Sequence, residues 1–229
     1  DSNYMVAWET LDSIVEPRCV WKIFAGRVNP SGMLLDTADI FIDQSTYPGS
    51  YKLAPDIDFC DPNYLVAWGD IEVIYGILIS REGVVVDSNP LVISPSSGDC
   101  YNPAVNSNDN NFMVVYESYD DFPYFWNIRG TRVTPDGTIL DPNSIPIAVW
   151  SDDQAKPDAV SDGTNFFVVW QDWRNHNWDI YGARVTSNGM TLDTLGIAIS
   201  TAPGNQMLPA VSFDGTNYIV IWQDFRNNA

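Results

Sequence analysis

The sequence predicts an all-β fold, a β-propeller built from four-stranded blades of about 50 residues each. Three observations predict this class. One pattern of short apolar runs separated by turns recurs along almost the whole chain. The runs are rich in β-branched and aromatic residues, which favour strands. No stretch shows sustained helical periodicity.

The clearest copy of the pattern runs from Pro157 to Ser200. PDAV is a short apolar run and SDGTN a turn, and FFVVW is a second strand. QDWRNHNW is a polar and aromatic loop, DIYGARV a third strand, TSNG a turn and LGIAIS a fourth strand. We call the four strands of such a unit a, b, c and d. Units of this kind need neighbours to bury their faces.

The other copies align with this one at fixed offsets. Four features recur in at least four copies: a proline opening strand a, an aromatic residue closing strand b, a glycine in the c–d turn, and an aspartate four residues after that glycine. The prolines are Pro55, Pro103, Pro157 and Pro209, and the aromatic residues are Trp8, Trp68, Tyr116, Trp170 and Trp222. The glycines are Gly32, Gly83, Gly137 and Gly189, and the aspartates are Asp36, Asp87, Asp141 and Asp193.

The repeats predict one propeller or propeller segment over 1–229. Its blades span roughly 1–54, 55–102, 103–156 and 157–208, with a partial repeat at 209–229. The chain opens with a b strand at 3–10, followed by its longest b–c loop, at 11–19. It therefore supplies b, c and d, then three complete blades, then a and b. This makes four blade-equivalents plus one spare strand at 217–224.

The order of the strands leaves the closure of the ring open. The last a strand can complete the first b, c and d strands by strand exchange, which closes four blades. Three interpretations of the spare strand remain: the chain is a piece of a longer repeat array, the strand pairs with another subunit and drives assembly, or the ring closes in another way.

Composition limits the partners. The formal net charge is −19, with 30 acidic residues against 11 Lys and Arg. Nucleic acids and anionic membranes need a basic surface, so we expect neither as a partner. No apolar run approaches the roughly 18 residues of a membrane span, which argues against membrane insertion.

The three cysteines occupy different places in the repeat and show no metal-binding spacing. On a propeller path Cys19 and Cys100 lie on the same face and Cys60 on the opposite one. A Cys19–Cys100 disulfide is the one pairing the path allows, and buried or free thiols are the favoured alternative.

The segment VVWQDWRNHNWDIYGARVTSNGMTLD resembles the tandem repeats of secreted and cell-surface bacterial proteins, in which W-x-D-x-R precedes D-I-Y-G-A-R-V. It is more distantly similar to the WD40-like repeats of TolB-type propellers. The resemblance covers essentially the whole chain and implies a blade, an extracellular or cell-surface location and no particular activity. Copies one and three depart from it, because Thr10 and Ser118 replace the aspartate, and copy two has Leu78 in place of the third-strand arginine.

Catalysis has little support in the sequence. The single histidine, His176, lies in a polar loop, and no nucleophile elbow, H-E-x-x-H or phosphate-binding loop is present. The adjacent carboxylates Asp120 with Asp121 and Asp152 with Asp153 point to opposite sides of a strand, so neither pair makes a ready acid and base. We therefore predict a protein that is not an enzyme and has no catalytic residues, with a glycoside hydrolase as the third hypothesis.

The b–c loops vary most in length, and variable loops on a fixed scaffold usually carry specificity. Aromatic rings beside carboxylates and amides suit a glycan. Asp172 and Arg174 either clamp a ligand or belong to the scaffold. In the scaffold interpretation, which is favoured, the aspartate caps the backbone amides of the loop and the arginine pairs with a neighbouring carboxylate to lock one blade against the next. Trp126 either contacts ligand or packs between blades, whereas Trp173 and Phe225 are freer. The candidate ligand-binding residues are Trp173, Phe225, Trp126, Asp172 and Asp224.

No metal site or cofactor is predicted. Calcium is compatible with the many oxygen ligands, but Arg174 inside the aspartate loop opposes it. The sequence thus predicts a non-catalytic extracellular scaffold or binding module, part of a larger secreted or surface protein, that binds a glycan or a surface protein through its b–c loops. The alternative is a structural adhesin or filament subunit that self-associates through unpaired terminal strands.

Overall fold

A computed structural model describes residues 3–226, apart from 16–17, 45–51, 71, 96–97 and 120–123. The side chains of 12–15, 18–20, 44 and 52–53 also lie outside the description. The described residues form 17 β-strands in five antiparallel sheets, which we call blades I to V. Among these residues, no helix is long and apolar enough to cross a membrane.

Each blade is a meander in chain order. Blade I contains β1 (Tyr4–Val15), β2 (Arg18–Val28) and β3 (Ile40–Gln44). Blade II contains β4 (Lys52–Cys60), β5 (Asn63–Asp70), β6 (Val73–Ser80) and β7 (Leu91–Val92). Blade III contains β8 (Cys100–Ser107), β9 (Phe112–Tyr119), β10 (Trp126–Val133) and β11 (Ile145–Ala148). Blade IV contains β12 (Gln154–Ser161), β13 (Phe166–Asp172), β14 (Asp179–Val185) and β15 (Ile197–Ser200), and blade V contains β16 (Gln206–Phe213) and β17 (Tyr218–Asp224).

This arrangement confirms the predicted fold class. Blade I has strands b, c and d, blades II to IV are complete, and blade V has a and b. The strands are therefore four blade-equivalents and one spare strand, as the repeats predict. The turn glycines have positive φ, for example 82° at Gly83 and 85° at Gly189, which explains why glycine recurs there.

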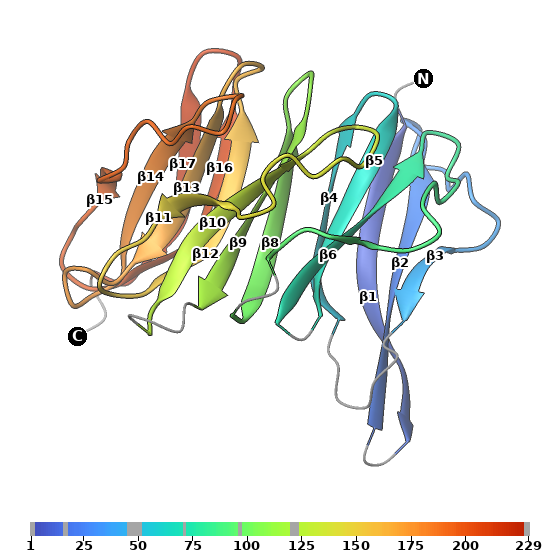
Figure 1. The fold of residues 1–229 in the computed structure, drawn as a ribbon, viewed down its shortest axis with the longest axis horizontal. Helices are drawn as coiled ribbons and strands as arrows, with labels where there is room; N and C mark the ends of the chain where they lie inside the picture. Colours follow the sequence, from blue (N-terminus) through green and yellow to red (C-terminus); the bar gives the residue numbers. More distant parts are fainter. Residues whose placement is uncertain are drawn as a thin grey trace.

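One predicted loop is wrong. Residues 11–19 were expected to connect strands b and c of blade I, but most of them extend β1 and β2 into a long hairpin. Leu11 pairs with Trp21, and after a bulge Ile14 pairs with Cys19. β-branched residues continue the strand pattern here, so pairing persists to Val15. In Figure 1 this hairpin projects away from the rest of the molecule.

The blades lie in an open row, with the two chain ends at opposite ends of the molecule (Figure 1). Strand exchange between β16 and blade I, which closes a four-bladed ring, is not formed: β16 pairs with β17, and Phe213 lies opposite Tyr218. The two pairings compete for the same edge of β16. A short turn brings β17 to that edge at a lower cost in loop entropy than the whole ring requires.

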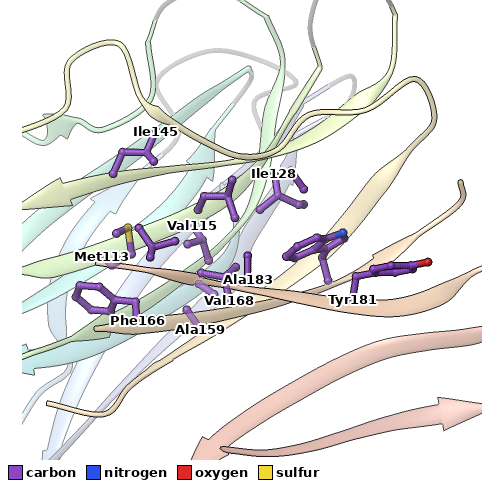
Figure 2. Close-up of a cluster of buried hydrophobic side chains, with 14 residues drawn as sticks. Met113, Val115, Ile128, Ile145, Ala159, Phe166, Val168, Tyr181 and Ala183 are labelled. Atoms are coloured by element: carbon purple, nitrogen blue, oxygen red, sulfur yellow. The ribbon is translucent and has the colours of Figure 1, made fainter. Parts of the chain in front are cut away.

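The hydrophobic core is divided between neighbouring blades. Between blades III and IV, Met113, Val115 and Ile128 face Val168 and Ala183 (Figure 2). Blades II and III share a second cluster, and blades I and II a third, around Trp68. Each aromatic residue that ends strand b in blades II to IV is fully buried. This explains why the sequence keeps that position aromatic.

The aspartate nine residues after the third-strand arginine is a scaffold residue. Asp141 Oδ2 accepts hydrogen bonds from the Arg132 backbone N at 2.9 Å and from its Nε at 2.8 Å. Arg132 Nη1 in turn donates to the carbonyl oxygen of Ser187, in the c–d turn of the next blade, at 2.9 Å. Arg27 makes the same contacts with Asp36 and with the carbonyl oxygen of Arg81. The motif therefore joins successive blades.

The structure tests the predictions for the cysteines in part. Cys60 is a buried free thiol whose Sγ lies 3.3 Å from the carbonyl oxygen of Asn108. Burial raises its pKa. Cys100 is also buried. The Cys19 side chain lies outside the described residues, so the Cys19–Cys100 pairing stays a prediction.

Candidate functional site

A depression of about 410 Å³ lies where the a strands of blades II to V meet. Each of these strands contributes an X-Pro-(Asp or Ala) segment, in the order Ala54–Asp56, Asn102–Ala104, Lys156–Asp158 and Leu208–Ala210. The register places the depression on the face of the b–c loops, because Leu53 pairs with Gly69, next to the end of strand b. We call it the axial depression.

The wall of the axial depression is a bulge repeated four times. The residue before each proline is left-handed, with φ of 51° at Ala54, 50° at Asn102, 54° at Lys156 and 53° at Leu208. The pairing with strand b shifts register at the same place in every copy. Proline has no N–H to donate to strand b, so a bulge suits it.

Side chains from the preceding blade hold these bulges. The backbone N–H of Lys156 donates to Glu117 Oε1 at 2.7 Å, and that of Leu208 donates to Gln171 Oε1 at 3.0 Å. Ala54 donates in the same way to Glu9 at 2.7 Å. Blade II has Gly69 at the acceptor position, and so has no side chain to offer there. In blades I, III and IV, the residue directly after the aromatic residue of strand b therefore holds the a strand of the next blade in place.

Two partly buried carboxylates line the axial depression. Asp56 Oδ2 accepts a hydrogen bond from the Val105 backbone N at 2.6 Å, and Asp158 Oδ2 accepts one from the Val211 backbone N at 2.8 Å. Asp158 Oδ1 also accepts from the Ala159 backbone N at 2.9 Å. Burial raises the pKa of both carboxyl groups, and the charge of Asp158 adds to the effect at Asp56. Both residues therefore link the a strands of neighbouring blades.

The W-x-D-x-R segment of blade IV is a closed network. Asp172 is fully buried and accepts hydrogen bonds from Trp170 Nε1 at 2.9 Å and from the Arg174 backbone N at 3.0 Å. Arg174 Nε donates to the same carboxylate at 2.9 Å. The Arg174 guanidinium stacks on Tyr181, at 4.1 Å, and on Trp150, at 4.7 Å. This geometry agrees with a loop cap, and Asp172 has no surface of its own to offer a ligand.

Blade V repeats the network in a more exposed form. Trp222 Nε1 lies 3.4 Å from Asp224 Oδ2, and the Arg226 backbone N lies 3.0 Å from Asp224 Oδ1. The Arg226 guanidinium lowers the pKa of Asp224. Phe225, between them, is 37% exposed. Asp224 is thus placed like Asp172, and Phe225 is the freer of the two predicted residues in this blade.

The tip of the blade IV loop is organised around a buried carboxylate. Asn175 Nδ2 and Asn177 Nδ2 donate to the two oxygens of Asp179, each at 2.7 Å. His176 lies between them, exposed and left-handed, with φ of 63°. Within the described part of the chain, no group of three or more His, Cys, Asp or Glu side chains could hold a metal ion.

The predicted aromatic residues lie on three consecutive blades. Trp173 packs edge-on against Trp178, with ring centroids 5.1 Å apart. Trp126 packs against Tyr119 at 5.0 Å and Tyr101 at 5.6 Å. All five rings keep partial exposure. Trp126, Trp173 and Phe225 therefore occupy the end of strand b or the start of strand c on three successive blades, and we call these three residues the aromatic line.

Of the adjacent carboxylate pairs, Asp120 and Asp121 lie outside the described residues. Asp153 is a structural link, because its Oδ1 accepts from the Trp126 backbone N at 3.0 Å and its carbonyl oxygen from the Trp173 backbone N at 2.9 Å. Sequence reasoning missed Asp56 and Asp158. The available signal was the aspartate after the opening proline in two of the four copies.

The sequence matches no family model and no curated protein. Solved structures do match. An endo-arabinase from Bacteroides thetaiotaomicron has a TM-score of 0.59 at 13% identity, over 97% of this chain and 85% of that chain. The chain is a propeller-like protein. The catalytic domain of a Coprinopsis cinerea α-L-arabinofuranosidase follows with a TM-score of 0.53 at 8% identity, over 100% and 82%. An arabinanase from Bacillus subtilis has 0.50 at 12% identity, over 100% and 87%.

These identities show the fold alone, an all-β arrangement that matches five-bladed propellers. The propeller part of the sequence resemblance is confirmed, whereas the finer likeness to secreted bacterial tandem repeats stays a hypothesis. The fold resembles that of an endo-arabinase and an arabinanase. Fold likeness alone does not assign a function, so any functional argument must come from the residues described above.

Proposed function

We propose that this propeller is a non-catalytic, extracellular or cell-surface module that binds a glycan through its b–c loops. One observation carries the proposal: partly exposed aromatic side chains lie at the same end of three successive blades, Trp126 at the start of β10, Trp173 directly after β13 and Phe225 directly after β17. Aromatic faces stack on sugar rings, and successive rings suit a chain of several sugars.

The electrostatics favour an uncharged glycan. With a net charge of −19, the protein repels acidic polysaccharides at low ionic strength. The polar groups near the aromatic positions are uncharged amides and negatively charged carboxylates. Both kinds of group form hydrogen bonds with sugar hydroxyl groups. Linear neutral polysaccharides, arabinan among them, are therefore the first ligands to test.

The binding test compares two exposed aromatic positions. Affinity electrophoresis through gels containing linear arabinan and other neutral polysaccharides should show retardation of the wild-type chain. Trp173→Ala should abolish most of that retardation. Phe41→Ala is the matched control, because Phe41 is 48% exposed but lies on β3 of blade I, away from the aromatic line. Equal retardation of both variants and wild type would refute binding at these loops.

A glycoside hydrolase is the second candidate, and one observation favours it. Asp56 and Asp158 share the axial depression and both have a raised pKa, as an acid catalyst requires. Against it, each carboxylate is already engaged by backbone N–H groups of the scaffold.

Release of reducing ends from the same polysaccharides tests the second candidate. Turnover that Asp56→Asn and Asp158→Asn both abolish, with binding intact, would establish a hydrolase and overturn the non-catalytic proposal. Absence of turnover by wild-type chain that binds the polysaccharide would exclude hydrolysis of that polymer.

A further inference from the structure

The blade IV loop between β13 and β14 contains two asparagine side chains whose orientation is fixed from inside the molecule. Asn175 Nδ2 and Asn177 Nδ2 each donate to one oxygen of Asp179, which is only 1% exposed. An ionised carboxylate accepts hydrogen bonds and has none to donate. The amide nitrogens must therefore face Asp179, and the amide oxygens are turned away from it.

Further oxygen atoms hold the same orientation. Asn177 Nδ2 also donates to the Gly204 carbonyl oxygen at 3.0 Å, in the segment that leads to blade V. Asn175 Nδ2 also lies 3.3 Å from the hydroxyl oxygen of Tyr181. A half turn of either amide group would place its oxygen against an oxygen of Asp179. Both orientations are therefore fixed, although Asn175 is exposed.

The two amide oxygens are left for other donors. Among the described residues, no group donates a hydrogen bond to Oδ1 of Asn175 or of Asn177. Asn175 is exposed, and the Oδ1 atom of the half-buried Asn177 is still accessible. Because one carboxylate holds both amide groups, the two oxygens lie close together. The loop tip thus presents two hydrogen-bond acceptors that are in place before any ligand arrives.

The backbone of the loop is anchored on both sides. The Trp173 N–H donates to the carbonyl oxygen of Asp153 at 2.9 Å, and the Trp173 carbonyl oxygen accepts from the His176 N–H at 2.9 Å. On the other side of the tip, the Trp178 N–H donates to Asn205 Oδ1 at 3.1 Å. The partly exposed ring of Trp173 and the two amide oxygens therefore belong to one rigid tip.

The blade scaffold does not require the carboxylate of Asp179. Asp179 pairs with Asp172 across β13 and β14. The matching positions in blades I, II and III are Lys22, Val73 and Asn127. Each of these blades forms the same strand pair with a different residue. Burying a charge costs free energy, so the carboxylate of blade IV indicates a role beyond strand pairing.

We propose that Asn175 and Asn177 recognise the hydroxyl groups of the glycan and that Asp179 is the residue that positions them. This assignment rests on the glycan binding proposed above. A sugar unit that stacks on Trp173 donates hydrogen bonds from neighbouring hydroxyl groups to the two Oδ1 atoms. Acceptors select donors, so a sugar whose hydroxyl groups are replaced by ethers is rejected, because it leaves both amide oxygens unpaired.

The test measures affinity electrophoresis of the full chain in linear arabinan, xylan and galactomannan, each in native and in O-methylated form. Methylation removes the hydroxyl donors and keeps the sugar rings. We expect the wild-type chain to bind a native polymer at least tenfold more tightly than its methylated form. Asn175→Ala and Asn177→Ala should each lower this native-to-methylated ratio roughly threefold to tenfold. Trp173→Ala should weaken binding to both forms.

Two further variants separate the lost acceptor from a disturbed loop. Asn175→Lys keeps a donor for Asp179 but has no acceptor oxygen, so its ratio should fall as in Asn175→Ala. Asp179→Asn keeps both asparagines and lets their amide groups turn, so its ratio should fall as well. His176→Gly is the matched control, because His176 is exposed between the two asparagines and its φ of 63° suits glycine. It should bind both forms like wild type.

The results distinguish this assignment from the glycan binding on which it rests. Equal wild-type affinity for native and methylated polymer, or an unchanged ratio in Asn175→Lys, would overturn the assignment, while binding that depends on Trp173 would still support the glycan module. A loss in His176→Gly as large as in Asn175→Ala would also overturn it, because loop shape would then set the affinity. No retardation of the wild-type chain in any of the polymers would overturn both. The midpoint of thermal unfolding shows that each variant is folded.

Discussion

Glu117 Oε1 accepts a 2.7 Å hydrogen bond from the backbone N–H of Lys156, across the joint between blades III and IV. Glu117 is only 7% exposed, and Lys156 is held in the left-handed region by this contact. The same joint between blades IV and V uses Gln171. An amide oxygen can therefore take the place of the carboxylate as acceptor for this backbone N–H, and Glu117 additionally pairs with Lys156 Nζ at 3.9 Å.

Glu117→Ala should lower the free energy of unfolding by about 1–3 kcal/mol, because it leaves the partly buried N–H of Lys156 without its acceptor. Glu117→Gln should cost much less, since glutamine does this task in the next blade. Urea denaturation of both variants measures the difference. Equal losses would mean that the charge, not the hydrogen bond, is what matters.

Trp170→Ala should destabilise the chain by roughly 3–5 kcal/mol, because the ring is fully buried between blades III and IV and its Nε1 bonds Asp172. Trp222→Ala removes the same residue from the same motif in the poorly packed blade V. We expect a clearly smaller loss there, measured by the same unfolding curves. A larger loss at Trp222 would contradict the burial gradient between the two blades.

Asp56→Asn should change how stability depends on pH. Burial raises the pKa of Asp56, so the folded chain binds this proton more tightly than the unfolded chain does. Its contribution to stability is therefore present below the unfolded pKa of about 3.9 and is lost as pH rises through the folded pKa. Asparagine keeps an oxygen acceptor for Val105 but does not titrate.

Relative to wild type, Asp56→Asn should therefore gain stability as the pH rises above the unfolded pKa of about 3.9, and the gain should level off above the folded pKa. The midpoint of urea unfolding, taken at several pH values for both proteins, measures this difference. A difference that is constant over that range would show that the folded state does not perturb Asp56.

Arg132→Ala should cost about 2 kcal/mol, because its guanidinium, 14% exposed, joins Asp141 to the turn of the next blade. Arg184→Ala removes the equivalent side chain of blade IV, whose hydrogen bonds among the described residues go to Asp193, so a smaller loss is expected. Thermal unfolding at low protein concentration makes the comparison. If the two losses are equal, the bond to the Ser187 carbonyl oxygen contributes nothing.

The repeat made the strand order predictable. The opening proline, the turn glycine and the aromatic end of strand b each reflect a local backbone or packing need, so their spacing reports the blades directly. The length of β1 was not predictable in this way, because Ile14 and Val15 gain a partner only when β2 continues opposite them. Pairing across a bulge is a tertiary choice that residue spacing does not encode.

The candidate site was less predictable than the fold. Asp172 attracted attention as a recurrent polar residue, and the structure places it in a buried cap. Asp56 and Asp158 are 102 residues apart in the sequence and meet only because their strands line one depression. Their shared proline is visible in the sequence, but the burial that raises the pKa of each carboxyl group depends on how the blades stack.

The open row of blades determines where local unfolding begins. Each blade packs on its immediate neighbours, so the chain behaves as a one-dimensional stack in which terminal units have one supporting interface and central units have two. Unfolding should fray from the ends, and amide hydrogens of blade V should exchange long before those of blade III. A destabilising substitution in a central blade divides the stack into two shorter segments. Each segment then unfolds less cooperatively than the whole row.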